Sequence, residues 1–291
     1  MAIFHCQAKA ISRATGRSAT AAAAYRAAVK IKDDRTGEVF DFTGKQGVVQ
    51  KTIILPESCS RMSRTELWNA AEQAEKRKDA KVAREWELAL PIELSAGARV
   101  LLAVAFGREL VRRYGVAADV CIHTPNRHGD QRNWHAHILT TTRRMEGNEL
   151  KEKTRILDSP LTSGKEVEAM RQLWAEMANR ALNQVCLETI DHRSLADQGI
   201  DRVGTKHLGP AATQMERRGI KTERGDLNRS PEHEAGKELE ILRAKQEGIT
   251  KARQNFEAWK KEKAAQKVRE ENRLMKIREA DNERKGMGWS R

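Results

Sequence analysis

A pair of histidines two residues apart, His135 and His137, is the first group in this sequence that could do chemistry. Apolar Ile138 and Leu139 and a run of threonines follow the pair, and this composition predicts a strand. Side chains at positions i and i+2 of a strand point to the same face, so both imidazoles are directed at one point, as two ligands of one metal ion require. A histidine pair alone is more often half-buried and hydrogen-bonded than metallated, so the rest of the chain must supply further ligands.

Two histidines compete for the position of a third ligand. His123 closes a short apolar run, residues 117–122, which also predicts a strand. The loop that follows contains Pro125 and Gly129, and it would let the two strands pair antiparallel and bring His123 beside the histidine pair. His128 is closer in sequence but lies in the middle of this loop. We favour His123 and keep His128 as the alternative.

Tyr25 is one of only two tyrosines in the chain. It lies in the alanine-rich segment 19–29, which follows Ser18, a good N-cap, and predicts a slim helix that can lie close against a sheet. Tyr25 is either an ordinary packing residue or a nucleophile. The second interpretation is possible because a phenolate attacks phosphorus once a metal or a base activates it.

A pair of glutamates, Glu85 and Glu87, lies in the segment 80–90, which predicts a strand. The two carboxylates then share one face, and Trp86 and Leu88 share the other. Such a pair serves as a base, as a partner that orients a histidine, or as a metal ligand. The residues alone favour the simpler interpretation of a polar, solvent-facing side.

The remaining elements predict an α+β fold with a central, mostly antiparallel sheet flanked by helices, and with the two histidine strands adjacent at its centre. Further strands are expected at 2–8 and 48–55, helices at 64–78, 95–114 and 166–188, and a turn between short extended pieces at 33–37. From about residue 226 Lys, Arg and Glu dominate, which is typical of a charged tail, either helical or disordered. We therefore expect two domains, 1–225 and 226–291.

The composition favours a polyanionic partner. The net charge is +13 with a pI of about 9.7, and nucleic acid is the first candidate. The four cysteines, Cys6, Cys59, Cys121 and Cys186, form no disulfide or zinc pattern, which favours a reducing cytoplasm. The N-terminus lacks the build of a signal peptide, and the most apolar helical stretch, 100–111, is too short to span a bilayer.

Taken together, these groups resemble the MobA/MobL family of plasmid mobilisation relaxases, within the HUH endonucleases. The resemblance covers roughly residues 1–220 and depends on the order of five motifs along the chain. The motifs are 16–26 (GRSATAAAAYR), 84–91 (REWELALP), 122–137 (IHTPNRHGDQRNWHAH), 191–194 (DHRS) and 207–210 (HLGP).

The resemblance implies a site- and strand-specific DNA nickase that acts at a plasmid transfer origin. Tyr25 would attack one phosphodiester, become linked to the 5′ phosphate and release a free 3′ hydroxyl, and the enzyme would later rejoin the strand. The linkage conserves the bond energy for that second step. A rolling-circle replication initiator would use similar chemistry, but in most such initiators the tyrosine follows the histidine pair, whereas Tyr25 precedes it. A non-catalytic basic DNA-binding protein is the other alternative.

The resemblance also implies the residues of the site. His135, His137 and a third histidine would hold a divalent ion, Mg²⁺ or Mn²⁺, although three imidazoles alone suit later transition metals better. Glu85 or Glu87 would assist, and Asp130 is expected beside the ligands. DNA-binding residues are assigned from the motifs: Arg17, Arg26, Arg132 and Arg193. Expected partners are single-stranded DNA, accessory proteins of the relaxosome and the coupling protein of a type IV secretion system.

Overall fold

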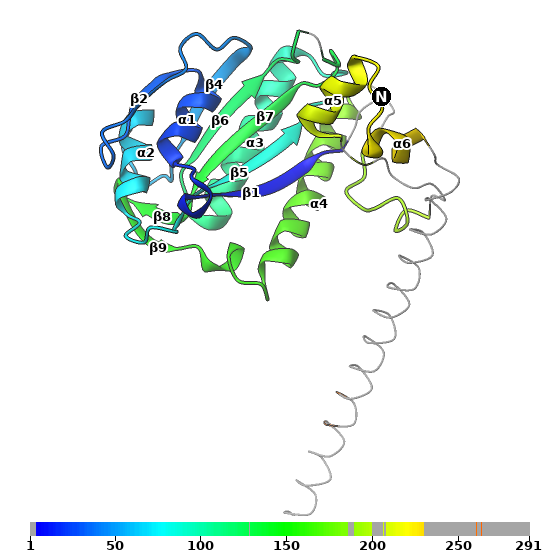
Figure 1. Cartoon of the computed structure of the whole chain (residues 1–291). Helices are drawn as coiled ribbons and strands as arrows, with labels where there is room; N and C mark the ends of the chain where they lie inside the picture. Colours follow the sequence, from blue (N-terminus) through cyan, green and yellow to red (C-terminus); the bar gives the residue numbers. More distant parts are fainter. Residues whose placement is uncertain are drawn as a thin grey trace, which may run out of the picture. The chain divides into compact units, whose positions relative to one another are not determined.

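A five-stranded sheet forms the centre of the fold (Figure 1). The computed structural model describes residues 4–127, 129–185, 189–199, 206, 208–229, 260 and 263. Every neighbouring pair in the sheet is antiparallel, which confirms the predicted α+β fold. The strands, in spatial order, are β1 (Cys6–Ser12), β5 (Lys81–Ala89), β7 (His135–Thr141), β6 (Ala118–His123) and β4 (Val48–Ile54).

The two histidine strands are adjacent, with β7 at the centre of the sheet, as predicted. Their register places His123 directly opposite His135 and Cys121 opposite His137. On its other side β7 pairs with β5, and Glu87 lies opposite His137. The register therefore gathers the histidines and glutamates on one face of three neighbouring strands.

The opposite face of the sheet packs against two long helices, α3 (Ala96–Tyr114) and α4 (Ser163–Leu182). Trp86 of β5, Phe106 of α3 and Trp174 of α4 are completely buried and stack edge to face, with ring centroids 6.2 Å and 5.4 Å apart. This confirms that Trp86 points away from the glutamate side. The large aromatic core makes this face the rigid support of the sheet.

The histidine side of the sheet carries the shorter helices α1 (Ala19–Ala27) and α2 (Arg64–Gln73). Five alanines of α1 are buried, so its backbone lies close to the strands, as the composition predicts. Ser18 caps its start by accepting a hydrogen bond from the Ala21 amide. The helix ends at Ala28, which has the left-handed conformation, φ 50°, that glycine adopts more readily.

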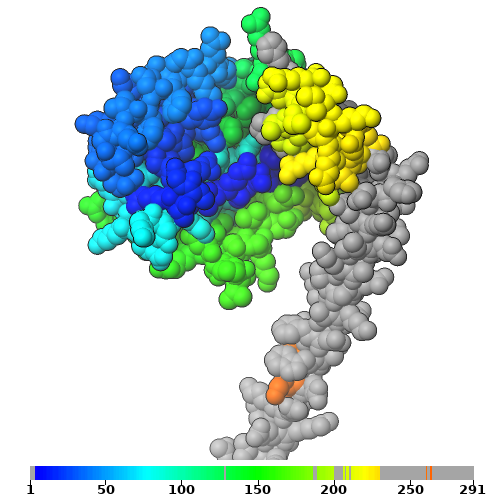
Figure 2. Space-filling model, in the orientation of Figure 1, coloured from blue at the N-terminus to red at the C-terminus, as the bar shows by residue number. Residues whose placement is uncertain are grey.

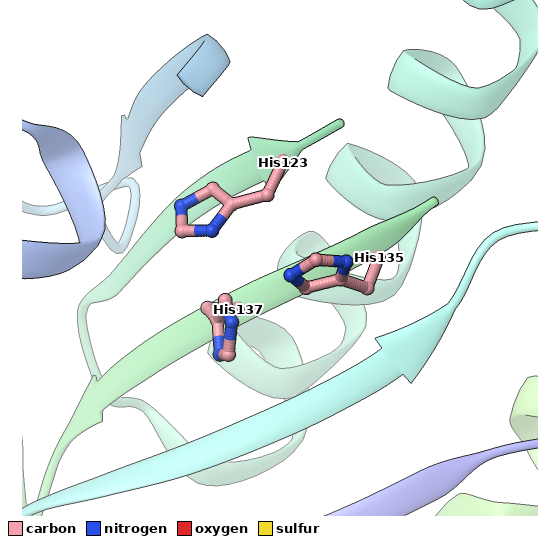
Figure 3. Close-up of side chains that lie close together, drawn as sticks. All are labelled: His123, His135 and His137. Atoms are coloured by element: carbon pink, nitrogen blue, oxygen red, sulfur yellow. The ribbon is translucent and has the colours of Figure 1, made fainter. Parts of the chain in front are cut away.

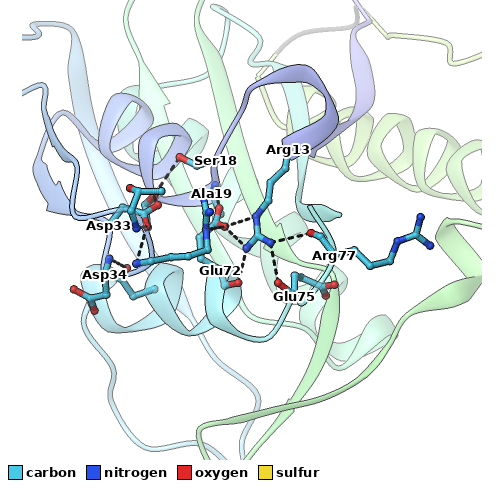
Figure 4. A network of polar contacts seen from close by, with 12 residues as sticks. Arg13, Ser18, Ala19, Asp33, Asp34, Glu72, Glu75 and Arg77 are labelled. Atoms are coloured by element: carbon cyan, nitrogen blue, oxygen red, sulfur yellow. Dashed lines mark hydrogen bonds and ion pairs between the residues drawn. The ribbon is translucent and has the colours of Figure 1, made fainter. Parts of the chain in front are cut away.

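A buried carboxylate fixes the start of α1 (Figure 4). Glu72 of α2 is fully buried and accepts a hydrogen bond of 2.6 Å from the Ala19 amide. It also accepts two from the guanidinium of Arg13, which in turn donates to the carbonyls of Glu75 and Arg77. One network therefore holds both the N-terminus of α1 and the turn before it, and these bonds fix the position of the helix on the sheet.

Several predicted boundaries are wrong. The first strand runs from Cys6 to Ser12, rather than over 2–8, because backbone pairing with β5 continues past the apolar run. Helix α2 ends at Gln73 and α4 spans 163–182, so both are shorter at their C-terminal ends than predicted. The extended pieces around 33–37 are β2 (Lys30–Lys32) and β3 (Val39–Asp41), as expected. Elements that were not predicted are the hairpin β8 (Arg143–Glu146) and β9 (Glu149–Lys153), the helices α5 (Gly209–Arg217) and α6 (Glu223–Arg229), and single 3₁₀ turns at Arg13–Thr15 and Arg155–Leu157.

The chain divides into two compact units, residues 1–192 and 193–291. In the second unit Glu216 of α5 accepts hydrogen bonds from Thr222 and from Arg229 of α6, which joins these two helices. Helix α6 crosses the boundary predicted at 225, and the division into a catalytic domain and a tail stays a prediction. Almost all of 226–291 lies outside the described residues. No helix among the described residues is long and apolar enough to cross a membrane.

Candidate metal centre and nucleophile

Three imidazoles from two adjacent strands converge on one point (Figure 3). One ring nitrogen each from His123, His135 and His137 lies within 4.8 Å of the others. The ring centroids are 4.8–5.3 Å apart. Among the described residues, this is the group that could hold a metal ion, and it is the set favoured from the sequence. His128, the alternative ligand, lies outside the described residues.

The outer nitrogen of each imidazole has an acceptor as its partner. His123 Nε2 is 2.7 Å from the Arg26 carbonyl, and His135 Nδ1 is 2.9 Å from the Asn133 carbonyl. His137 Nδ1 is 2.8 Å from Glu85 Oε1. Carbonyl and carboxylate oxygens only accept, so each of these nitrogens carries the proton and donates it. The second nitrogen of each ring therefore keeps a free lone pair, which is the arrangement of metal-binding histidines.

Burial keeps the imidazoles of His123 and His135 neutral. Burial is the main reason why the pKa of His123 falls to about 3, and the neighbouring imidazoles lower it further. The hydrogen bond to the Arg26 carbonyl raises the pKa but is outweighed. The pKa of His135 is also lowered, again mainly by burial. A metal ligand has to be the neutral imidazole, so these histidines are ready to bind a cation at neutral pH. The donor set fits a divalent metal ion, with one ring nitrogen each from His123, His135 and His137 as the ligands.

Glu85 is the carboxylate that orients the site. Its side chain is buried, and it accepts hydrogen bonds from His137 and from Arg26 Nε at 2.6 Å. The guanidinium of Arg17 lies 3.9 Å away. Burial by itself raises the pKa of a carboxyl, but the hydrogen bonds from His137 and Arg26 outweigh it and hold the pKa of Glu85 well below its usual range. The solvent-facing interpretation is therefore wrong for Glu85, because the residue is buried and the side chain of Arg26 from α1 lies against it.

Glu87 has a different environment. It forms an ion pair of 2.5 Å with Lys9 of β1, and about a quarter of its side chain is exposed. Burial works against ionisation, but the bond from Lys9 lowers the pKa of Glu87 overall. Glu87 lines the same cleft as the imidazoles, whereas Glu85 is buried and does not line it, so the two glutamates hold separate positions.

Tyr25 lines the same cleft as the three imidazoles. The cleft has a volume of about 660 Å³. Tyr25 is near the end of α1, the residue is 43% exposed, and the carbonyl of the next residue, Arg26, is the one that accepts from His123. A phenol from a helix and imidazoles from two strands therefore meet at one surface, as the motifs suggest.

Positive charge surrounds this cleft. Lys45 and Arg127 line it together with Arg26. Burial, and then the nearby charge of Arg26, lower the pKa of Lys45 to about 8. Gly47, φ 86°, forms part of the wall, and a Cβ atom there would lie 3.0 Å from Thr124 Oγ1. Neither Lys45 nor Arg127 was selected from the sequence, because each lies in a loop with no spacing pattern.

The other residues selected from the sequence lie elsewhere. Asp130 was expected beside the ligands, but its carboxylate binds Arg132 at 2.7 Å in an exposed loop, and the carboxylate bonded to an imidazole is Glu85. Arg132, two positions away in sequence, outcompetes a histidine for the Asp130 carboxylate, because its guanidinium offers two donors within the same short loop. Arg193 belongs to the second unit, where its carbonyl accepts a hydrogen bond from the Gln198 side chain.

Comparisons with known proteins find similar sequences. A sequence profile described as the MobA/MobL family matches residues 17–218. The chain is 43% identical over 245 residues to "Mobilization protein MobL" of Acidithiobacillus ferridurans, covering 75% of this chain and 65% of that protein. It is 31% identical over 270 residues to "Probable mobilization protein MobA" of Bifidobacterium longum (strain NCC 2705), covering 79% and 47%. The chain thus spans less than two thirds of the length of these curated relatives.

A solved structure is similar as well. It is described as "Molecular Basis of Vancomycin Resistance Transfer in Staphylococcus aureus" and superimposes with a TM-score of 0.59 at 30% sequence identity. The match covers 66% of this chain and 100% of the solved chain. A third relative, "Conjugal transfer protein TraA" of Rhizobium radiobacter, is 32% identical over 265 residues, covering 78% of this chain and 24% of that protein.

Proposed function

The chain belongs to the MobA/MobL family, and from this premise we propose that it is a relaxase. It nicks one DNA strand at a plasmid transfer origin, forms a 5′-phosphotyrosine adduct that starts conjugative mobilisation, and rejoins the strand afterwards. The observation that carries this proposal is the shared cleft of Tyr25 and the three imidazoles.

The chemistry follows from these positions. The phenol oxygen of Tyr25 forms a bond to phosphorus, the bond from phosphorus to the 3′ oxygen breaks, and the departing oxygen takes up a proton. A divalent ion held by the imidazoles would supply positive charge that polarises the scissile phosphate and stabilises the charge of the transition state. Glu85 keeps the proton on His137 Nδ1 and so directs the other ring nitrogen to the cleft. Glu87 is the carboxylate residue that lines the cleft beside Tyr25, which makes it our candidate acceptor for the phenol proton.

The DNA is held by charge. Arg17, Arg26, Arg132 and Arg193 are the proposed DNA-binding residues. Arg17 also lines a second cleft, and Lys76 and Lys78 in that cleft have no carboxylate partner among the described residues. We propose that backbone phosphates of the strand lie in both clefts, and that the substrate is single-stranded DNA in the cytoplasm. Accessory proteins of a relaxosome and a secretion coupling protein are the proposed further partners.

Adduct formation on a single-stranded oligonucleotide tests the activity. Tyr25→Phe keeps the ring and removes the nucleophile, so we expect no covalent adduct and nearly unchanged DNA binding. Tyr114→Phe is the matched control, because the Tyr114 hydroxyl is buried against Glu166 on the far side of the sheet. Adducts that persist in Tyr25→Phe and disappear in Tyr114→Phe would contradict the assignment. A protein that binds DNA but never forms an adduct would favour the non-catalytic alternative.

Metal titration tests the ligands. Cleavage should need Mg²⁺ or Mn²⁺ and stop with a chelator. His135→Ala and His137→Ala should lose both metal binding and cleavage. A comparison of His123→Ala with His128→Ala decides the third ligand: we expect the first to lose metal binding and the second to keep it, and the reverse result would assign His128.

A further inference from the structure

Burial does not hold Tyr25 in place, since 43% of the residue is exposed. Two side chains from one short turn contact its ring. Phe42 packs edge to face against it, with centroids 5.2 Å apart and planes at 89°. The Lys45 Nζ atom lies 3.7 Å from the ring centroid, closer than the Arg26 guanidinium at 5.1 Å.

The turn that carries these two residues is itself fixed. The Lys45 amide donates to the Phe42 carbonyl at 2.9 Å, and the Phe42 amide donates to the Val29 carbonyl at 3.2 Å. The second bond ties the turn to the segment just after α1. Thr43 adds a hydrogen bond of 2.7 Å to Asp41 at the end of β3. The segment 30–47 lies at the surface beside α1 (blue in Figure 2).

Lys45 makes a second contact with the same tyrosine. Its ammonium donates a hydrogen bond of 2.9 Å to the Tyr25 carbonyl. Among the described residues no carboxylate lies within ion-pair distance of Lys45, so its charge is not neutralised by an acid. One ammonium group therefore holds both the main chain and the ring of Tyr25, and it faces the cleft that the imidazoles line.

We propose that the turn Phe42–Lys45 clamps the nucleophile, with Lys45 as the positioning residue that sets the ring of Tyr25. The expected effect on the reaction rate rests on the proposed relaxase function, whereas the expected effect on the mobility of the ring does not. A cation over an aromatic face is attracted by the ring quadrupole, and the hydrogen bond to the carbonyl fixes the distance at which the cation is held. A phenol presented in one orientation attacks a phosphate more often than one that rotates freely.

Lys51 provides a matched control. Its ammonium also donates to a carbonyl at the end of α1, that of Ala27, at 3.3 Å, but it has no contact with the tyrosine ring. Lys45→Met removes the charge and the hydrogen bond, Lys45→Arg keeps both, and Lys51→Met removes a comparable bond without touching the ring. Circular dichroism and thermal melting establish that each variant is folded.

The first measurement is independent of nicking. The chain has only two tyrosines, so the ring signals of ¹³C-labelled tyrosine are assigned with Tyr114→Phe. We expect the ring of Tyr25 to become more mobile in Lys45→Met by ¹³C relaxation, and to stay as ordered as in the unchanged protein in Lys45→Arg and Lys51→Met. An equally ordered ring in Lys45→Met would overturn the clamp, whether or not the protein nicks DNA.

The second measurement is the single-turnover rate of adduct formation at saturating oligonucleotide. We expect Lys45→Met to lower this rate by about tenfold, which is the effect of losing a partly desolvated cation–π contact, while oligonucleotide affinity changes less. Lys45→Arg should restore most of the rate. If Lys45→Met instead weakened binding alone, with the saturated rate unchanged, Lys45 would be a phosphate contact and the positioning role would be wrong. Absence of any adduct in the unchanged protein would reject the relaxase function and leave the relaxation result to decide the clamp.

Discussion

Substitution of Glu85 by glutamine should lower both the metal affinity and the stability of the protein. Glu85 accepts from His137 at 2.8 Å and from Arg26 at 2.6 Å and 3.1 Å, and only 1% of the residue is exposed. Glutamine keeps the shape and one acceptor oxygen. It removes the charge, however, and turns a donor towards groups that are themselves donors.

The magnitude follows from these contacts. Breaking a buried ion pair by neutralising one partner costs about 3–5 kcal/mol, and we take the lower end, about 3 kcal/mol, because the glutamine oxygen keeps one bond. At about 2–4 °C per kcal/mol for a unit of this size, the melting temperature should fall by roughly 6–12 °C. Loss of the carboxylate behind a ligating histidine should weaken metal binding by about 10–100-fold.

Two control variants make this prediction specific. Asp119→Asn also breaks a buried pair, with Arg64 at 2.6 Å, and removes an acceptor from Trp68, but Asp119 has no contact with the imidazoles. It should lose similar stability and keep its Mn²⁺ affinity. Glu87→Gln breaks a partly exposed pair, so it should cost less than about 1 kcal/mol. Stability by urea unfolding and Mn²⁺ affinity by calorimetry are the assays. Unchanged Mn²⁺ affinity in Glu85→Gln, or an equal loss in Asp119→Asn, would refute the reasoning.

Three further predictions concern strain, acid stability and salt. Ala28→Gly removes the left-handed alanine at the end of α1 and should raise stability by about 0.5–1 kcal/mol in urea unfolding, because glycine adopts this conformation without a Cβ clash; a loss of stability would contradict it. His123 has a folded-state pKa of about 3 against about 6.5 when unfolded, so the unfolded chain binds more protons between these values and stability should fall as the pH drops from 6.5 towards 3. That fall should be smaller in His123→Asn, and equal pH slopes would exclude the buried neutral imidazole. Lys76→Ala and Lys78→Ala should each reduce the salt slope of single-strand binding by about 0.7, whereas Lys165→Ala, on an exposed part of α4, should leave it unchanged.

The predicted tail offers a separate test of the domain division. A truncation after Gly225 would cut helix α6, so the chain should end after Arg229 instead. If the tail supplies mainly non-specific attraction, this truncation lowers affinity for cognate and scrambled oligonucleotides alike and keeps the preference for the cognate strand. Loss of that preference with unchanged scrambled binding would make the tail a recognition element.

The strand and helix positions of the candidate site residues could be predicted from the sequence because their signals are local. The spacing of His135 and His137 sets their common face through the period of a strand, and Ser18 followed by alanines specifies the helix of Tyr25. The alternation of Glu85 and Trp86 likewise separates the polar side of β5 from its core side. Each of these inferences needs only the geometry of one element.

The tertiary structure decided which partners these residues meet. Glu85 became a buried ion-pair acceptor because the side chain of Arg26, from α1, comes within 2.6 Å of it, although the two residues are 59 positions apart in sequence. Lys45 reached the ring of Tyr25 because a turn after β3 folds back onto the end of α1. Asp130 paired with Arg132 in its own loop instead of with a histidine. Contacts of this kind depend on how separate elements pack, and no periodicity within one segment encodes them.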